Sequence, residues 1–471
     1  MTRHVAIIGG GFFGTMLAIH LMHRGLQATI IKRRPAAGVG LAYGDADPVH
    51  LLNVPAANMS AFPDRPDHFV RWLEANGRAD SAEAFIPRRV FGDYIRDLLA
   101  EAKARFPGRL AIVRDRAVDL QIGCAGVSLT RASGSAIEAD VAVLAVGNLP
   151  PGAPAGLDPA AFEKDSYIGD PWQHDPAAGL LPDDRVLILG TGLSMIDMVL
   201  RLRLEGFTGQ ITALSRRGLM PHCHASQSPY QPLDHFPPAE LSLLVKRVRA
   251  RSAAIGWRNA VDELRLFTQA LWSGADPVRR ARFMRHLRPW WDIHRHRIAP
   301  RVADEIDGLL KERSLTIFAA RVATLSQHGD MIEVVFQRRG RRAPETARFR
   351  RVINCMGPLS DVRRADEPIL RRLADRGLIR ADGLGLGIDV DRHSRTFDCH
   401  GGSSDSLFAI GPMSRGAFWE IIAVPDIRVQ AAQVAQRLDL NDGYTDGRAP
   451  DAGSTIGGGL NRSADDIPHL R

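Results

Sequence analysis

The sequence predicts an α/β fold made of two Rossmann-like dinucleotide-binding domains, with a helical insertion in the second domain. Two observations lead to this prediction: a glycine-rich turn directly follows an apolar strand at the start of the chain, and a second turn of this kind occurs near residue 190. The length agrees, because 471 residues exceed what one hydrophobic core normally supports.

The first unit begins with the apolar run HVAIIG over residues 4–9, and Gly9, Gly11 and Gly14 follow with the spacing G-x-G-x-x-G. The next apolar residues recur every four positions, which predicts a helix, and a second strand is expected over residues 28–32. The glycines allow a tight turn, close approach of the backbone to a pyrophosphate and close helix packing. We interpret this βαβ unit as dinucleotide-binding; a glycine-rich turn without a ligand is the alternative.

One residue departs from this pattern at once. The second strand of such units usually ends in an acidic residue that bonds the adenosine ribose, but here it ends in Lys32-Arg33-Arg34. Either other groups hold that ribose, or the positive charge meets a phosphate.

The second unit has a strand over residues 185–189, followed by Gly190, Gly192 and Ser194, a helical pattern, and another strand. Met195 occupies the third glycine position, so the match to the fingerprint is incomplete. We interpret this unit as the second dinucleotide-binding site.

Arg216 and Arg217 follow the last strand of the second unit, where an acidic residue would indicate NADH. A guanidinium at this place suits the 2′-phosphate of NADPH, so we expect NADPH in preference to NADH. The alternative is that both arginines cap a solvated strand end.

Cysteine usage and charge narrow the function classes. The four cysteines are far apart without a Cys-x-x-Cys pair, so neither a disulfide framework nor a dithiol redox centre is indicated. The formal charge of +8 comes from arginines scattered through the chain, which does not indicate a nucleic-acid surface. No apolar run approaches a membrane span and no signal peptide precedes the first strand, so a cytoplasmic protein is expected.

Two nucleotide-binding units without a dithiol indicate a bound flavin that is reduced by a nicotinamide. We expect an FAD-binding domain over residues 1–182 and an NADPH-binding domain over 183–398, with its helical insertion at 237–313. The chain would return to the FAD-binding domain over 399–440. Residues 441–471 are rich in Gly, Asp, Ser and Pro, which predicts a flexible tail.

Five shorter segments complete the expected fold. Residues 139–147 and 351–357 are strand-like and would close the two sheets. The arginine-rich run at 338–342 lies between two alternating segments, 332–337 and 346–349, and is interpreted as a hairpin turn rather than a nucleic-acid patch.

Several longer strings carry a family resemblance. They are GVGLAY at 38–43, HLLNVPA at 50–56, PR at 87–88, RPWWD at 288–292 and VPDIR at 424–428. With them, residues 4–438 resemble the bacterial FAD/NAD(P)-binding oxidoreductase family that includes FAD-dependent urate hydroxylases and aspartate N-monooxygenases.

The resemblance implies an FAD site. In it, Gly9, Gly11 and Gly14 hold the diphosphate, while Asn53, Pro55 and Ser60 approach the isoalloxazine. The segment from Gly411 to Pro425 would return to the flavin, and Arg88, Val424 and Pro425 are counted with the cofactor-binding candidates. Members of the family usually carry Glu at the position of Lys32. They also more often carry Glu than Asp at the position of Asp426, in the string VPDIR.

The expected chemistry is that of a single-component flavin monooxygenase. NADPH would reduce the flavin, dioxygen would form a peroxyflavin, and a dry pocket would protect it until a small anionic nitrogen-containing substrate attacks. The alternatives are an NADPH-dependent flavin reductase or dehydrogenase, and a non-catalytic flavin-binding sensor or accessory protein.

The substrate candidates come from three places, and each has a structural alternative. His224 ends the string PHCH, which has too few neighbouring ligands for zinc, so no metal is expected. It would line the loop after the last strand of the second unit, and the alternative is an ordinary surface loop. Arg288 and Arg297 would face an anionic ligand, and the alternatives are internal ion pairs or nucleic-acid binding. Trp419 would shape the flavin pocket or pack in the core.

Overall fold

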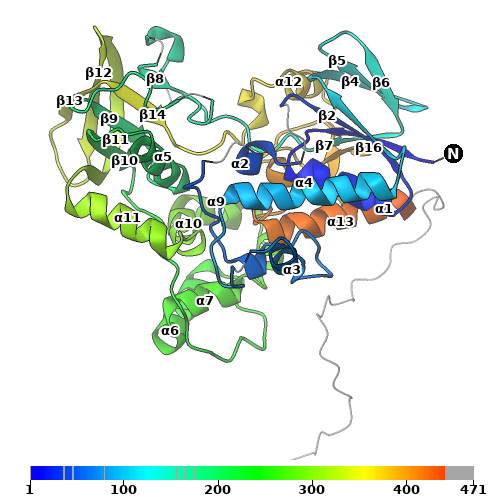
Figure 1. The fold of residues 1–471 in the computed structure, drawn as a ribbon, viewed down its shortest axis with the longest axis horizontal. Helices are drawn as coiled ribbons and strands as arrows, with labels where there is room; N and C mark the ends of the chain where they lie inside the picture. The colour runs from blue at the N-terminus through cyan, green and yellow to red at the C-terminus, as the bar shows by residue number, and fades with distance from the viewer. Residues whose placement is uncertain are drawn as a thin grey trace, which may run out of the picture.

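The computed structural model describes residues 2–34, 38–44, 47–78, 80–154, 156–163, 165–173 and 175–440. The predicted tail at 441–471 lies outside the described residues. Two large sheets form the body of the molecule (Figure 1), which agrees with the α/β fold expected from the sequence.

The first sheet has six strands. Their order is β15 (Arg395–Phe397), β16 (Ser403–Ala409), β7 (Val141–Leu144), β1 (His4–Ile8), β2 (Gln27–Lys32) and β3 (Leu110–Arg114). All neighbours pair in parallel except β15 and β16. The strand expected within 139–147 is therefore confirmed as a central strand of this sheet.

Alternate side chains of β1 enter different layers because successive residues of a strand face opposite sides. Val5 and Ile7 pack in a core with helices α1 (Phe12–His23) and α13 (Val424–Leu440). Ala6 and Ile8 pack toward α12 (Pro368–Asp375) and a small antiparallel sheet. The strands of that sheet are β4 (Ala117–Gly123), β5 (Gly126–Arg131) and β6 (Ala136–Ala139). On its outer side α1 packs with α3 (His68–Ala75) and α4 (Arg88–Arg105).

The second sheet has seven strands. Their order is β13 (Glu345–Phe349), β12 (Met331–Arg338), β11 (Leu315–His328), β10 (Gln210–Ser215), β9 (Arg185–Leu189), β14 (Arg351–Asn354) and β8 (Tyr167–Ile168). The strands from β11 to β8 pair in parallel, whereas β12 and β13 continue the sheet as an antiparallel hairpin. The hairpin expected around residues 338–342 is thereby confirmed.

Helices dominate the segment where the insertion was expected. They are α6 (Leu241–Ile255), α7 (Trp257–Leu264), α8 (Thr268–Ser273), α9 (Pro277–His286), α10 (Arg288–Arg295) and α11 (Pro300–Lys311). Helix α11 packs with α5 (Leu193–Leu204) on the second sheet. Figure 1 shows α9 and α10 between the two sheets, with α6 and α7 at the outer edge.

The predicted domain boundaries differ from the sheets at two places. Residues 167–168, expected in the first domain, pair with β14 at the edge of the second sheet. Residues 368–375 and 395–397, expected in the second domain, pack on or pair within the first sheet. The two-residue β8 is too short to show a hydrophobic periodicity. Helix α12 belongs to the domain of the first sheet because its apolar residues pack against β4.

Shorter elements complete the described part of the chain. They are α2 (Gly40–Gly44) and the 3-10 helices η1 (Ala56–Asn58), η2 (Pro159–Ala161), η3 (Val362–Arg364) and η4 (Gly411–Met413). Within the described ranges, no helix is both long enough and apolar enough to cross a membrane.

Candidate functional site: two glycine turns and the junction between them

The first glycine turn joins β1 to α1 and has no room for side chains. Gly9 has φ +118°, and a Cβ on it would lie 2.2 Å from the carbonyl oxygen of Ala145 in the neighbouring chain segment. A Cβ on Gly14 would lie 2.0 Å from the carbonyl oxygen of Gly9, so this glycine lets α1 pack closely on the turn. Gly11 precedes α1, and its position lacks a side-chain cap hydrogen bond. The first amides of α1 therefore remain available to a diphosphate.

The strand end after this turn carries Lys32 in a buried position. Lys32 is 8% exposed, and its Nζ donates a hydrogen bond of 2.8 Å to the carbonyl oxygen of Arg34. Burial, together with the nearby charge of Arg114, lowers the pKa of Lys32. Arg33 pairs with Glu367 at 3.0 Å. This basic strand end confirms the departure noted in the sequence, because the expected carboxylate is replaced by an internally bonded ammonium.

The second glycine turn repeats the backbone geometry of the first. Gly190 has φ +114°, and a Cβ on it would lie 2.2 Å from the carbonyl oxygen of Cys355. Gly192 precedes α5, without a side-chain cap hydrogen bond and with no atom within 4 Å of where its Cβ would be. Ser194 is half-buried in the first turn of α5, whereas Met195 is fully buried in the core. The mismatch at the third glycine position is thus accommodated by a buried side chain, and the helix N-terminus stays open.

The loop after β10 is tied to the second glycine turn. The hydroxyl of Thr191 lies 2.8 Å from that of Ser215 and donates a hydrogen bond to the carbonyl oxygen of Leu219. Arg216 is exposed in this loop and Arg217 is half-buried, with Nη2 donating to the carbonyl oxygen of Arg285 at 3.2 Å. Arg216 is therefore the freer of the two predicted phosphate-binding arginines.

A buried ion pair joins the two glycine-turn units. Arg88, at the start of α4, donates from Nη1 and Nη2 to the two carboxylate oxygens of Asp197 on α5, at 2.8 and 2.9 Å. Its Nε donates to the carbonyl oxygen of Leu51 at 3.0 Å, and Nη2 also lies 3.4 Å from Oδ1 of Asn53. These contacts occupy four of the five N–H donors of a guanidinium. Arg88 thus positions Asn53 and links the two units. Its hydrogen bonds go to protein groups, whereas the sequence suggested that it contacts the cofactor directly.

His224 reaches the same junction from the loop after β10. Its Nε2 lies 2.8 Å from the carbonyl oxygen of Asn53, so Nε2 carries the hydrogen. Burial lowers the pKa of His224, although the hydrogen bond to Asn53 opposes this effect. The predicted candidates His224 and Asn53 are therefore in contact, although 171 positions separate them in the sequence.

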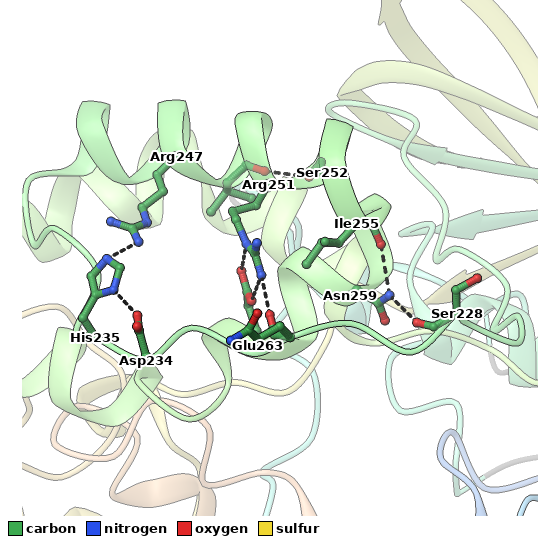
Figure 2. Close-up of polar contacts among 11 residues, drawn as sticks. Ser228, Asp234, His235, Arg247, Arg251, Ser252, Ile255, Asn259 and Glu263 are labelled. Atoms are coloured by element: carbon green, nitrogen blue, oxygen red, sulfur yellow. Dashed lines mark hydrogen bonds and ion pairs between the residues drawn. The ribbon is translucent and has the colours of Figure 1, made fainter. Parts of the chain in front are cut away.

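The loop that carries His224 is held by α6 and α7 (Figure 2). Arg251 on α6 forms a bidentate pair with Glu263 on α7, at 2.9 and 2.8 Å, and also donates to the carbonyl oxygen of Gln231 in the loop. Asn259 donates to the carbonyl oxygen of Ser228 at 3.0 Å. The helical insertion therefore fixes the loop backbone on the far side of His224.

The returning C-terminal segment meets the first glycine turn. Gly411 has φ +75° and a Cβ on it would lie 2.8 Å from the ring of Phe13, while its amide donates to Oε1 of Gln430 at 2.9 Å. Ser60 is buried, and its hydroxyl bonds to the carbonyl oxygens of Phe62 and Arg65, so it shapes a local turn.

The start of α13 completes this side of the site. Val424 is buried and Pro425 is half-buried in the first turn of that helix, and Pro55 directly precedes η1. Arg428 of α13 donates to the carbonyl oxygen of Ser60 at 2.9 Å, which links these two segments.

The remaining substrate candidates make internal contacts. Arg297 is 2% exposed and forms a bidentate pair with Asp262, at 3.0 and 2.7 Å. Arg288 pairs with Asp292 one helical turn away, at 3.3 Å. Trp419 stacks on Trp272 of the insertion with ring centroids 4.6 Å apart. In the structure, Arg288 and Arg297 thus form internal ion pairs and Trp419 packs in the core, which are the alternatives to substrate binding given for them above.

Two residues of interest could not be identified from the sequence. Asp197 lies on the buried side of an apolar helix pattern, where its pairing with Arg88 has no sequence signal. Arg415, in the returning segment, is half-buried and stacks over Trp419 at 4.3 Å, a contact that no local sequence pattern indicates. Among the described residues, no group of three His, Cys, Asp or Glu side chains is placed to hold a metal ion.

Comparisons with known proteins agree with this geometry. Residues 6–149 match the model of a family described as FAD-NAD(P)-binding. The fold is that of flavoproteins with two dinucleotide-binding domains. No curated protein matches the chain significantly in sequence.

Solved structures of this fold match nearly the whole chain at low identity. Ornithine hydroxylase from Pseudomonas aeruginosa has a TM-score of 0.61 and 14% identity, covering 94% of this chain and 100% of its own. L-lysine 6-monooxygenase from Pseudomonas syringae has a TM-score of 0.62 and 16% identity, covering 93% and 99%. Thioredoxin reductase from T. acidophilum has a TM-score of 0.52 and 14% identity, covering 93% and 99%. These similarities define the fold, and the reaction must be argued from the site.

Proposed function

We propose that this protein is an FAD-dependent, NADPH-using oxidoreductase, and specifically a single-component flavin monooxygenase that hydroxylates a small anionic nitrogen-containing compound. The observation that carries the proposal is the pair of open glycine turns, each ending at a 12-residue helix without a side-chain cap. The buried pair of Arg88 and Asp197 connects them. One chain thus offers two dinucleotide sites that face a common junction.

The residues present fit both cofactors at their diphosphates. Gly11 and Gly192 leave the amides at the two helix N-termini uncovered, and the close contacts of Gly9 and Gly190 keep the turns in shape. FAD would lie against the first turn and NADPH against the second, with Arg216 near the 2′-phosphate. When bound, the flavin supplies hydride acceptance from NADPH and activation of dioxygen.

The junction residues would position the flavin and exclude water. The backbone of Asn53 is held by His224, and its side chain by Arg88, so this loop presents a fixed surface to the isoalloxazine. Gly411 closes the opposite side against Phe13. Such fixed residues around the isoalloxazine would help to protect a reactive flavin from water.

The cysteines favour a monooxygenase over a dithiol reductase. Cys124, Cys223, Cys355 and Cys399 are all free, and none forms a Cys-x-x-Cys pair. Burial raises the pKa of the Cys355 thiol, which makes it a poor nucleophile. Structural neighbours include bacillithiol disulfide reductase from Staphylococcus aureus and an ornithine N-hydroxylase from Kutzneria in complex with reduced FAD, NADP+ and L-ornithine. The absence of a Cys-x-x-Cys pair supports hydroxylation rather than disulfide reduction.

The proposal is tested with purified protein supplied with FAD. A monooxygenase is yellow, oxidises NADPH faster than NADH, consumes dioxygen and forms hydroxylated product in step with NADPH. NADPH oxidation that does not depend on oxygen would instead identify a reductase or dehydrogenase. No FAD binding and no turnover would favour a non-catalytic sensor or accessory role.

Nicotinamide preference has its own matched test. Arg216→Ala and Arg217→Ala together should raise the KM for NADPH much more than the KM for NADH, because only NADPH carries the 2′-phosphate. Arg321→Ala, which removes one exposed arginine on β11, serves as the control for loss of a positive charge elsewhere on the surface. Equal effects of the double variant on both nicotinamides would contradict the phosphate assignment.

A further inference from the structure

Buried polar atoms that lack a hydrogen-bond partner are concentrated where the helical insertion meets the returning segment. Of the buried side-chain nitrogen and oxygen atoms without a hydrogen-bond partner in the described part of the chain, half belong to this one region. They are in Asp292, Arg295, Arg415, Trp419, Glu420, Asp426 and Arg428. Three of these atoms are nevertheless in ion pairs, because Arg295 Nε lies 3.5 Å from Glu420 Oε2 and Asp426 Oδ2 lies 3.6 Å from Arg265. Buried polar atoms normally have partners, so the remaining atoms, in Asp292, Arg415, Trp419 and Arg428, indicate missing ligand or water contacts.

Arg415 is the centre of this region. It lies in the turn four residues after Gly411, and its guanidinium stacks over the ring of Trp419 at 4.3 Å. Among the described residues, none accepts a hydrogen bond from its guanidinium or pairs with it as an ion. Burial lowers the pKa of Arg415 to about 10, and the nearby positive charge of Arg288 acts in the same direction. Arg415 is thus a half-buried cation without an ion-pair partner among the described residues.

The acids nearest to Arg415 are already engaged by other groups. Glu420, which is 4% exposed, accepts a hydrogen bond of 2.9 Å from Nε1 of Trp291 and pairs with Arg295 at 3.5 Å. Asp292 pairs through Oδ2 with Arg288. Both acids act on Arg415 only from beyond ion-pair distance. Neither of these two carboxylates therefore forms an ion pair with Arg415.

The surrounding packing makes this guanidinium a rigid one. Trp419 is 2% exposed and stacks on Trp272, whose Nε1 donates to the carbonyl oxygen of Gly416 at 2.8 Å. Phe283 packs edge-on against Trp419 with ring centroids 5.2 Å apart. A guanidinium held on a fixed aromatic face loses little freedom when it binds an anion, which favours recognition of a planar group.

We propose that Arg415 is a binding residue for the carboxylate of the substrate, which makes the substrate an amino carboxylate or a related nitrogen-containing carboxylate. The inference rests on the proposed function, because the position of Arg415 in the segment that returns to the flavin turns an anion site into a substrate site. A carboxylate fits because its two oxygens accept hydrogen bonds from the two N–H groups on one edge of the guanidinium. Its single negative charge also balances the positive charge of Arg415. Arg288, half-exposed beside it, adds a favourable field.

The first test is calorimetric titration of the FAD-loaded protein. The probes are the proteinogenic amino acids, L-ornithine and succinate, each compared with its carboxamide. At least one carboxylate should bind while its neutral carboxamide does not. Arg415→Gln should weaken that binding by about 10- to 100-fold, the range for a hydrogen-bonded charge, and Arg415→Lys by less because the charge remains.

The control is Arg301→Gln, which removes an equal charge from a side chain that is 82% exposed on α11. It should leave carboxylate binding unchanged. The inference is overturned if no carboxylate binds, if carboxamides bind equally well, or if the Arg415 variants bind like the parent protein.

A second measurement separates the substrate from the flavin as the source of the anionic group. FAD content and the flavin absorption spectrum should be the same in Arg415→Gln as in the parent protein. Loss of FAD from this variant, with carboxylate binding retained, would assign Arg415 to the cofactor and overturn the inference.

The same measurements distinguish the two proposals. NADPH oxidation with FAD but without Arg415-dependent carboxylate binding would remove only the substrate assignment. Arg415-dependent carboxylate binding in a protein that neither retains FAD nor oxidises NADPH would remove the proposed function and leave an anion site.

Discussion

The ion pair between Arg88 and Asp197 should couple the two dinucleotide-binding units energetically. The side chains are 14% and 10% exposed, and the guanidinium donates to both carboxylate oxygens as well as to Leu51. Removing one partner of a buried pair leaves the other charge uncompensated, which costs about 3 to 5 kcal/mol. Because both side chains keep some solvent contact, we expect Arg88→Met to lower the free energy of unfolding by about 3 kcal/mol, near the lower end.

A double-mutant cycle checks this value. Arg88→Met, Asp197→Leu and the double variant are unfolded in urea, with tryptophan fluorescence and flavin release followed together. The double variant should be clearly more stable than the sum of the two single losses predicts, because it buries no lone charge. Additive losses, or single losses below about 1 kcal/mol, would refute the view that this pair holds the units together.

A matched functional readout accompanies the cycle. Arg88 also contacts Asn53, whose carbonyl oxygen bonds His224. Arg88→Met should therefore slow flavin reduction by NADPH even under conditions where the protein remains folded, since the loop beside the flavin loses its support. Unchanged reduction kinetics in the folded variant would restrict the pair to a stabilising role.

Two further predictions concern the first unit. Gly14→Ala should abolish FAD binding, because its Cβ would lie 2.0 Å from a carbonyl oxygen, whereas Gly308→Ala, also a helical glycine but with open space around its Cβ position in α11, should retain FAD. Equal FAD content in both variants would contradict the packing argument. Burial lowers the pKa of His20 from 6.5 to about 4, with His23 adding to the effect, so the unfolded chain binds the proton first as the pH falls. Lowering the pH from about 7 to about 4.5 should therefore cost about 2 kcal/mol of stability that His20→Gln does not lose, measured by urea unfolding beside the exposed control His400→Gln; parallel losses in all three proteins would exclude His20.

Local patterns were enough to predict most of the fold. Gly9 and Gly190 follow apolar strands and precede helices, and the structure gives both a positive φ against a neighbouring carbonyl group. Such turns are readable in sequence because only glycine tolerates that conformation and that approach. The helical insertion and the β12–β13 hairpin were likewise visible, since their periodicity is set by neighbouring residues along the chain.

The domain boundaries were less accessible. The two-residue β8 joins the second sheet, and α12 packs on the first, although both were expected in the other domain. Membership of a sheet depends on which distant strand or apolar face an element meets, and short elements carry too few residues to show it.

The sequence by itself determined where the nucleotide turns lie and which strands and helices surround them. Only the tertiary structure decided what each charged residue does there: Arg88 pairs with Asp197 across 109 positions, Arg297 is neutralised by Asp262, and Arg415 is left on Trp419 without a counter-ion. The reason is physical, because the same side chain takes a different role at each of the three positions. Its role is set by the burial and the partners that distant segments bring to it.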